Sequence, residues 1–126
     1  VIDADELAVG CRFEDVVVHK ALFIVDIHNP AGAGQAEDKI QYCDPYDLPY
    51  RCFVPKGLEG LLVAGRCISG THRAHASYRV MTICMAMGEA MGIAAALSVK
   101  NDCTPRQLDV KLLQKTMTDK GIELFD

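Results

Sequence analysis

The polar residues most able to do chemistry in this chain gather between positions 65 and 79. His72 and His75 form an H-x-x-H pair, and three arginines, Arg66, Arg73 and Arg79, surround them. Cationic side chains and the N–H groups at the start of a helix both stabilise negative charge. We therefore interpret this segment as a turn that faces an anionic ligand, with His72, His75 and Arg79 as the candidate catalytic groups.

The same two histidines leave other interpretations open. A metal site needs a third and usually a fourth ligand, and His28 is distant and single, so we expect no metal. A metal-dependent hydrolase that uses His72 and His75 stays a less favoured alternative. A polar surface turn without chemistry also competes, as does a non-enzymatic α+β binding or assembly module.

The six cysteines do not follow a disulfide or zinc pattern. No two form a C-x-x-C pair, and the closest, Cys43 and Cys52, are nine residues apart. We expect reduced thiols in an intracellular, cytoplasmic protein. Cys67 follows an apolar run and lies beside Arg66, so it is a candidate redox thiol.

A strand and a long helix are expected to position the polar turn. Residues 61–64 are continuously apolar, which is typical of a parallel strand buried on both faces. Residues 78–99 are predicted to form a helix, whose N-terminal N–H groups would point towards the edge of the sheet where ligands bind. Gly88, Gly92 and Ala96 recur every four residues, which predicts a helix face lying close against the sheet.

The same helix is long and apolar enough to be weighed as a membrane span. Residues 80–99 contain one charged residue, Glu89, near the middle, where a charge is expensive in lipid. The stretch is also rich in Ala, Gly and Met rather than Leu. We therefore expect a buried core helix and no membrane span.

Outside this region the pattern predicts two more helices. The first covers residues 3–15, with Asp3 as N-cap and Glu6 completing a capping box. The last begins at Thr104, with Pro105 in its first turn, and ends near Gly121.

Two further strands and a loop complete the expected elements. β-Branched and apolar residues predict strands at 21–27 and 50–54. Residues 29–47 are rich in Gly, Pro and Asp and are predicted to form a loop with a mobile tip at 31–34.

Composition bounds the class of protein. The 126 residues are 50% hydrophobic, enough for a globular core, and the net charge of −4 gives no field for binding nucleic acid. No signal peptide is visible, and the chain starts at Val1 without an initiator Met, so we expect a piece of a larger protein. The fold class is α/β, or α+β as an isolated fragment.

Four long motifs resemble one family, the bacterial FAD-dependent oxidoreductases. They are YDLPYRCFVPKG at 46–57, LLVAGRCIS at 61–69, AHASYRVM at 74–81 and VDIHNP at 25–30. Members resemble the flavoproteins with two dinucleotide-binding domains. In those proteins an N-terminal βαβ unit holds the ADP part of FAD, and a C-terminal strand and helix return to complete a Rossmann-like domain.

The resemblance implies a set of cofactor-binding residues. Gly65 and Arg66 would lie beside the ribityl and pyrophosphate groups, although many related flavoproteins carry an acidic residue where Arg66 stands. The residues around the flavin pyrimidine edge would be Ala76, Ser77, Arg79, Val80 and Met81. A helix N-terminus and an arginine favour the negative charge of reduced flavin.

The resemblance also implies an organisation for the whole protein. Residues 1–49 would belong to a substrate-side or connecting segment, 50–100 to the strand–turn–helix of the FAD domain, and 101–126 to a terminal helix. The full-length protein would be an oxidoreductase acting on a small molecule. This chain would need the missing N-terminal half as its partner, would bind FAD weakly or not at all alone, and would self-associate.

Overall fold

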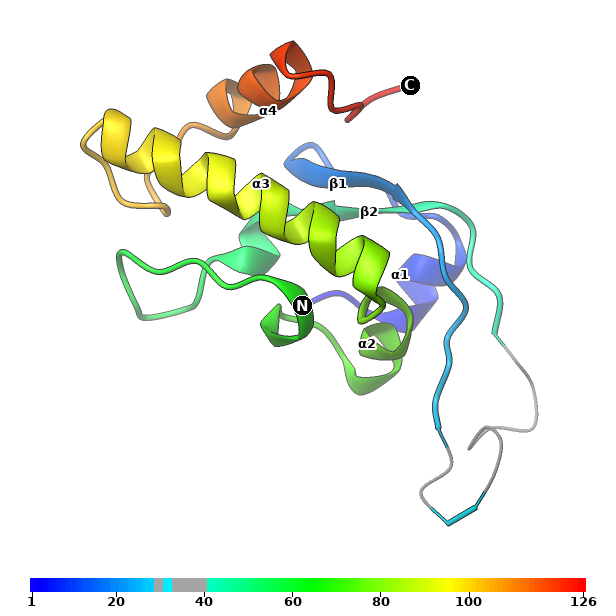
Figure 1. Ribbon diagram of the computed structural model, residues 1–126. Helices are drawn as coiled ribbons and strands as arrows, with labels where there is room; N and C mark the ends of the chain where they lie inside the picture. The colour runs from blue at the N-terminus through cyan, green and yellow to red at the C-terminus, as the bar shows by residue number, and fades with distance from the viewer. Residues whose placement is uncertain (29–30, 33–40) are drawn as a thin grey trace.

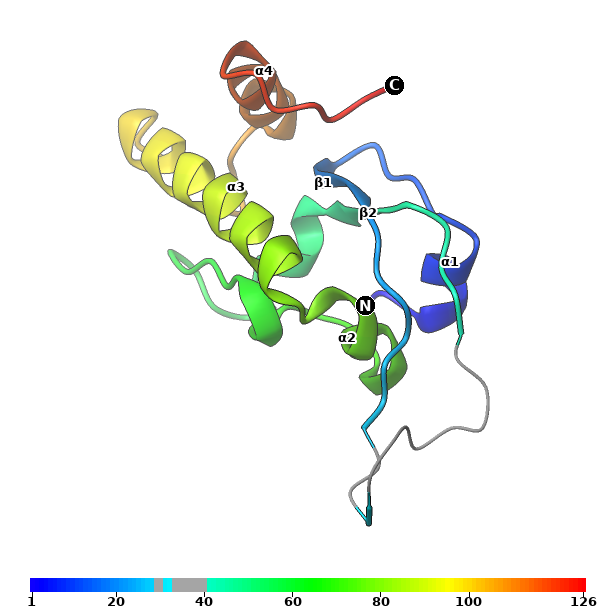
Figure 2. The same cartoon turned by 45° about the vertical axis from the view of Figure 1, so that its right-hand side comes forward.

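The computed structural model describes residues 1–28, 31–32 and 41–126, and has a mixed α+β fold (Figure 1). In chain order the elements are α1 (Ala4–Ala8), β1 (Val16–Ala21), β2 (Tyr46–Pro49), the 3₁₀ turns η1 (Tyr50–Phe53) and η2 (Gly65–Cys67), α2 (His72–Tyr78), α3 (Met81–Lys100) and α4 (Val110–Asp119). Helix α3 crosses the two strands, α4 lies along α3, and α1 and α2 lie together at the other end (Figures 1 and 2).

The sheet consists of two short antiparallel strands within the described residues. Val16 pairs with Pro49, Val18 with Leu48 and Ala21 with Tyr46, with irregularities between these pairs. The observed strand β1 therefore begins and ends earlier in the chain than the strand predicted at 21–27. The run of three valines starts the strand at Val16, while beyond Ala21 one isolated bridge, between Val25 and Gln41, continues the pairing.

The core forms where one face of α3 meets β1. The buried residues of this helix are Ile83, Met87, Ala90, Met91, Ala94 and Ser98. The face that carries Gly88, Gly92 and Ala96 is exposed instead, and a Cβ added at Gly88 or Gly92 would meet no atom within 4 Å. The prediction that this stripe lies against the sheet is wrong for this chain, because the larger residues bury more apolar surface.

Helix α1 confirms the predicted capping box but not the predicted length. Asp3 accepts a hydrogen bond from the Asp5 amide, and its own amide donates to Glu6 Oε2 at 2.8 Å. The helix ends at Ala8 rather than at residue 15. Gly10 follows with φ +65°, and a Cβ there would lie 2.8 Å from the Pro45 oxygen, so the chain turns where only glycine fits.

The strands predicted at 50–54 and 61–64 are not formed. Residues 50–53 make the turn η1, whose first two amides bond to Asp15. Tyr50 N donates to the backbone carbonyl of Asp15, and Arg51 N donates to the Asp15 carboxylate. Residues 61–64 run beside this turn, and Val63 N donates to Phe53 O at 2.9 Å. An apolar run becomes a strand when a neighbouring strand pairs with it, and the described chain offers none here.

The helix predicted at 78–99 is confirmed, but it starts at Met81 and a separate helix precedes it. Six of the seven residues of helix α2, 72–77, lie in the segment predicted to be a turn. The last helix also starts later than predicted. Asp109 rather than Thr104 is its N-cap and accepts from Lys111 N at 2.9 Å, while 105–108 form a turn. Gly121, with φ +87°, follows its end as expected.

Helix α3 has the length and apolar composition of a membrane-crossing helix. The core helix of a water-soluble protein passes the same test, so this property alone carries little weight. Most of the loop predicted at 29–47, with its tip at 31–34, falls on residues 29–30 and 33–40, which lie outside the described residues.

Candidate functional site

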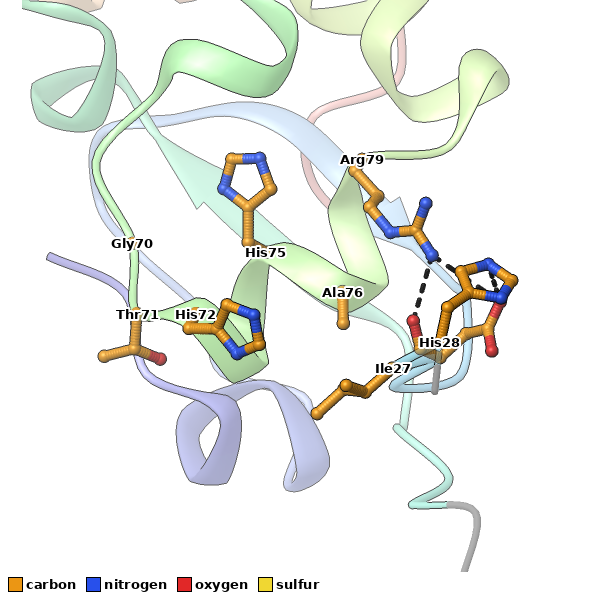
Figure 3. A pocket seen from close by; sticks show the side chains of 9 residues that line it. Ile27, His28, Gly70, Thr71, His72, His75, Ala76 and Arg79 are labelled. Carbon is orange, nitrogen blue, oxygen red and sulfur yellow. Dashed lines mark hydrogen bonds and ion pairs between the residues drawn. The ribbon is translucent and has the colours of Figure 1, made fainter. Parts of the chain in front are cut away.

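The candidate site is an open cavity of about 380 Å³ against α2. It brings together two segments that are far apart in sequence. Its lining residues are Asp26, Ile27, His28, Gly70, Thr71, His72, His75, Ala76 and Arg79. Figure 3 shows His72 and His75 projecting from α2, with Arg79 reaching towards the segment that carries His28. The three predicted catalytic residues thus line one cavity together.

Backbone pairing at the start of α2 holds this wall of the cavity. Ile2 N donates to Ser69 O, and Thr71 N donates back to Ile2 O at 2.8 Å. Thr71 then caps the helix, because its hydroxyl accepts from Ala74 N at 3.3 Å. Gly70 is required by close packing: a Cβ there would lie 1.8 Å from the hydroxyl oxygen of the buried Tyr78.

The opposite wall is the segment 26–28, fixed by Arg79. Arg79 Nη2 donates to the backbone oxygen of Asp26 at 3.0 Å and lies 3.6 Å from its carboxylate Oδ2. His28 Nε2 lies 3.3 Å from the same carboxylate oxygen. Asp26 N in turn donates to Ala76 O at 3.5 Å. The Asp26 carboxylate therefore orients Arg79 and His28 on one side of the cavity.

His75 lies in an environment that disfavours its charged form. Partial burial lowers its pKa from the ordinary value of 6.5, and the positive charges of Arg79, His72 and Arg66 lower it further. Its ring also packs at 58° to the Tyr78 ring, with 5.0 Å between centroids. A neutral imidazole at near-neutral pH can accept a proton, so His75 has the protonation state that a general base needs.

Of the predicted cofactor residues, Ala76 and Arg79 line this cavity and the others lie outside its lining. Gly65 and Arg66 form η2, which packs against α3. Gly65 has φ +72°, and a Cβ there would lie 3.8 Å from Cys84 Sγ. Arg66 is exposed and close enough to His75 to affect its charge.

Ser77, Val80 and Met81 differ from one another in environment. Ser77 is buried, and its hydroxyl donates to Phe23 O at 2.6 Å and bonds the Tyr46 hydroxyl at 2.8 Å. Val80 is the N-cap of α3 without a side-chain hydrogen bond, and Met81 is 80% exposed. The start of α3 is therefore open, and its first amides lack a side-chain cap. The roles of these residues towards a cofactor remain predictions.

Among the described residues, no group of three or more His, Cys, Asp or Glu side chains is arranged so that it could hold a metal ion. All six cysteines are free thiols. Cys67 is exposed and its thiol bonds the carbonyl oxygen of Ala64 at 3.2 Å.

Sequence reasoning assigned no definite role to Asp26 and His28, which form half of the cavity. Both stand in the motif VDIHNP at 25–30, where an acid and an imidazole at the end of an apolar run were the available signal. Nothing in the pattern shows that this segment meets residues 70–79, because the contact is made through long-range backbone bonds.

The fold and the site together define a mixed α+β chain with a cavity at the start of α2 that is lined by hydrogen-bond donors. A family model described as FAD dependent oxidoreductase matches residues 1–117. The chain belongs to the FAD-dependent oxidoreductase family, as the sequence motifs predicted. No curated protein and no solved structure matches it.

Membership implies FAD as the cofactor of the full-length protein. The donor set of the cavity fits part of that molecule. Arg79, His72 and His75 can all donate to the oxygens and nitrogens of a flavin ring edge. The Asp26 carboxylate, which would repel a reduced flavin, lies against Arg79 and His28.

Proposed function

We propose that this chain supplies the flavin-ring side of the FAD site in an FAD-dependent oxidoreductase. The observation that carries the proposal is the meeting of His28, His72, His75 and Arg79 around one cavity, in a chain whose family uses FAD. In this proposal the chain completes a Rossmann-like domain whose ADP-binding half belongs to polypeptide outside this sequence.

The residues would divide the work between charge and proton transfer. FAD, when bound, supplies two-electron oxidation and reduction of a small-molecule substrate. Arg79 would stabilise negative charge at the ring edge, and its hydrogen bond to Asp26 O holds the guanidinium in place. His75, kept neutral by burial and nearby cations, would accept a proton from the substrate at an unprotonated ring nitrogen. His72 would then bind the substrate or the flavin.

The predicted partner is the N-terminal half of the same protein. The exposed apolar face of α3 and the uncapped amides at its start support this part of the proposal, since both are normally covered. Gly65, Arg66, Ala76, Ser77, Val80 and Met81 would then line the cofactor in the assembled site. Six free thiols support a cytoplasmic location.

The test measures the flavin midpoint potential of the full-length protein. Replacing Arg79 by methionine (R79M) removes positive charge from the ring edge, so reduced flavin loses stabilisation. We expect the potential to fall by on the order of 30 mV, the equivalent of a tenfold change in the equilibrium constant for a two-electron couple.

Arg73→Met is the matched control, because Arg73 is an arginine on α2, the helix that Arg79 follows, and does not line the cavity. Its side chain donates to Gln41 Oε1 at 2.8 Å. Equal potentials for both variants and the unmodified protein, with FAD bound in all three, would overturn the assignment of Arg79 to the flavin.

A further inference from the structure

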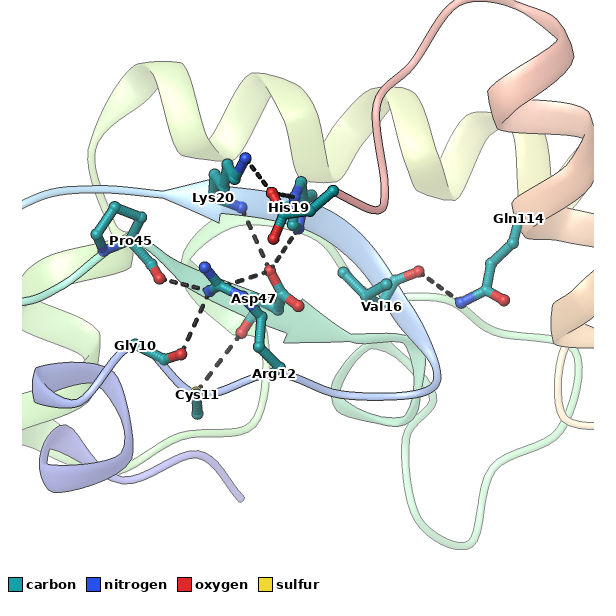
Figure 4. A network of polar contacts seen from close by, with 10 residues as sticks. Gly10, Cys11, Arg12, Val16, His19, Lys20, Pro45, Asp47 and Gln114 are labelled. Carbon is teal, nitrogen blue, oxygen red and sulfur yellow. Dashed lines mark hydrogen bonds and ion pairs between the residues drawn. The ribbon is translucent and has the colours of Figure 1, made fainter.

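A second polar cluster lies away from the FAD-family cavity, between β1, β2 and the segment 124–126. Its centre is Asp47, a carboxylate that is 2% exposed. Asp47 Oδ1 accepts from His19 Nδ1 at 2.8 Å and from Lys20 N at 3.3 Å, and Arg12 Nη1 lies 3.6 Å away (Figure 4). Three donors around one buried oxygen make this a fixed anchor rather than a surface ion pair.

The His19 ring bonds Asp47 through one nitrogen, and its other nitrogen makes no hydrogen bond with the described residues. The carboxylate accepts a hydrogen bond from Nδ1, so the ring is held in one orientation. The His19 side chain is 5% exposed, and its Nε2 makes no hydrogen bond within the described chain. A buried ring nitrogen without a hydrogen bond is costly, and such an atom in a native protein calls for an explanation, of which a bound group is one.

The chain itself shows which chemistry suits this position. Asp126 Oδ1 lies 3.6 Å from His19 Nε2, just beyond hydrogen-bond distance, and makes an ion pair with Lys20 Nζ. Leu124, which is 2% exposed, anchors the segment beside β1. A carboxylate thus approaches the free nitrogen but does not reach it.

A cavity of about 400 Å³ adjoins the cluster and has room for a ligand. His19, Asp47 and Asp126 line it together with Arg12, whose side chain is 44% exposed. The rest of the wall is largely apolar or aromatic: Phe13, Val16, Leu124 and Phe125, with the exposed Glu14 at the rim. The cavity therefore combines an apolar body with a polar end, where the donors Arg12 and His19 lie beside the carboxylates of Asp47 and Asp126.

We propose that this cavity is a binding site for a small carboxylate with an apolar body, and that Asp126 competes with the ligand for it. The ligand carboxylate would take the position that Asp126 approaches, beside Lys20, and would accept a hydrogen bond from His19 Nε2. Arg12 would supply further positive charge, and Phe13 and Phe125 would pack on the ligand body. This site does not depend on the FAD assignment.

The test titrates the whole chain with benzoate, a probe that has both required features, and follows binding by calorimetry and by the NMR signals of the His19 ring. Asp126→Asn removes the competing carboxylate while keeping the shape of the side chain. We expect it to tighten benzoate binding about tenfold, since a nearby like charge is lost. We expect His19→Gln to weaken binding to Asp126→Asn by at least about tenfold.

The matched control is Asp119→Asn, which removes an exposed carboxylate that is likewise paired with a lysine, Lys115, but is remote from the cavity. It should leave benzoate binding unchanged. If benzyl alcohol binds as tightly as benzoate, the ligand carboxylate is not recognised and its proposed role is wrong. If inorganic phosphate binds as tightly as benzoate, the apolar body of the ligand contributes nothing and that part of the proposal is wrong. Failure of Asp126→Asn to bind benzoate, or a weaker affinity than the unmodified chain, would overturn the site itself.

Discussion

The charge state of His75 is set by burial and by three neighbouring cationic side chains. Burial, Arg79, His72 and Arg66 all lower its pKa from 6.5, with burial the largest cause. Because the unfolded chain binds this proton more readily than the folded one, the contribution of His75 to the free energy of unfolding decreases as the pH falls below 6.5. The same shift keeps the ring available as a proton acceptor at neutral pH.

Replacing Arg79 by glutamine (R79Q) should raise the pKa of His75 part of the way back towards 6.5. One of the positive charges that oppose protonation is lost, while the burial remains. NMR titration of the His75 ring signals measures the effect. Arg73→Gln, which removes a charge that is not among the causes of the shift, should leave the His75 pKa unchanged; a shift of similar size in that variant would contradict the local explanation.

Gly70→Ala should destabilise the chain by about 1–3 kcal/mol, the usual effect of forcing an added group into packed surroundings. The added Cβ would lie 1.8 Å from the Tyr78 hydroxyl, and this ring is fully buried. Gly88→Ala is the control, since its Cβ meets nothing, and it should stabilise α3 by about 0.5–1 kcal/mol. Urea unfolding measures both, and similar values for the two variants would refute the packing argument.

At the scale of elements, local signals predicted helices better than strands. The capping box of Asp3 and Glu6 was found where expected, because both partners lie within one turn. Residues 61–64 have the composition of a strand but no partner strand in the described chain. The composition of a short segment shows that it is apolar. A strand also requires a neighbouring strand to pair with, and a short stretch of sequence does not show whether one is present.

The start of α4 is a direct test of capping. Asp109→Ala removes the side chain that accepts from Lys111 N and should lower the free energy of unfolding by about 1 kcal/mol. Thr104→Ala changes the cap that the sequence pattern favoured, and should cost less than half as much because α4 begins six residues later. Thermal or urea unfolding compares them, and a larger loss for Thr104→Ala would restore the earlier start.

The candidate site was predicted in part for the same physical reason. His72, His75 and Arg79 lie within one or two helical turns of each other, so their spacing alone placed them together. Asp26 and His28 join them through contacts that span about fifty residues, such as the bond from Arg79 to Asp26 O. The buried pair of His19 and Asp47 is a similar case, because strand pairing rather than spacing brings it together.

At the scale of the whole molecule, α3 is half covered. One face packs on β1, and the other exposes Met81, Met85 and Val99, which are 80%, 71% and 84% accessible. A continuous exposed apolar face of this kind is typical of a surface that meets another polypeptide.

The isolated chain should therefore self-associate as its concentration rises, and Met85→Glu should shift the equilibrium towards monomer about tenfold or more, since it places a charge on the apolar face. Sedimentation velocity over a concentration series measures this. Gln107→Glu adds the same charge in an exposed turn outside that face and should leave association unchanged. A monomeric unmodified chain at all concentrations would remove the basis for an apolar interface.

The pairing of Ile2 with residues 69–71 also has a practical consequence. Any peptide joined ahead of Val1 must leave the molecule beside Gly70 and Thr71, at the rim of the histidine-lined cavity. A purification tag or fluorescent fusion attached at that end would crowd the very opening that ligand assays probe. Removing the tag before measurement, or attaching a label through an exposed lysine on α4 such as Lys111, avoids this obstruction.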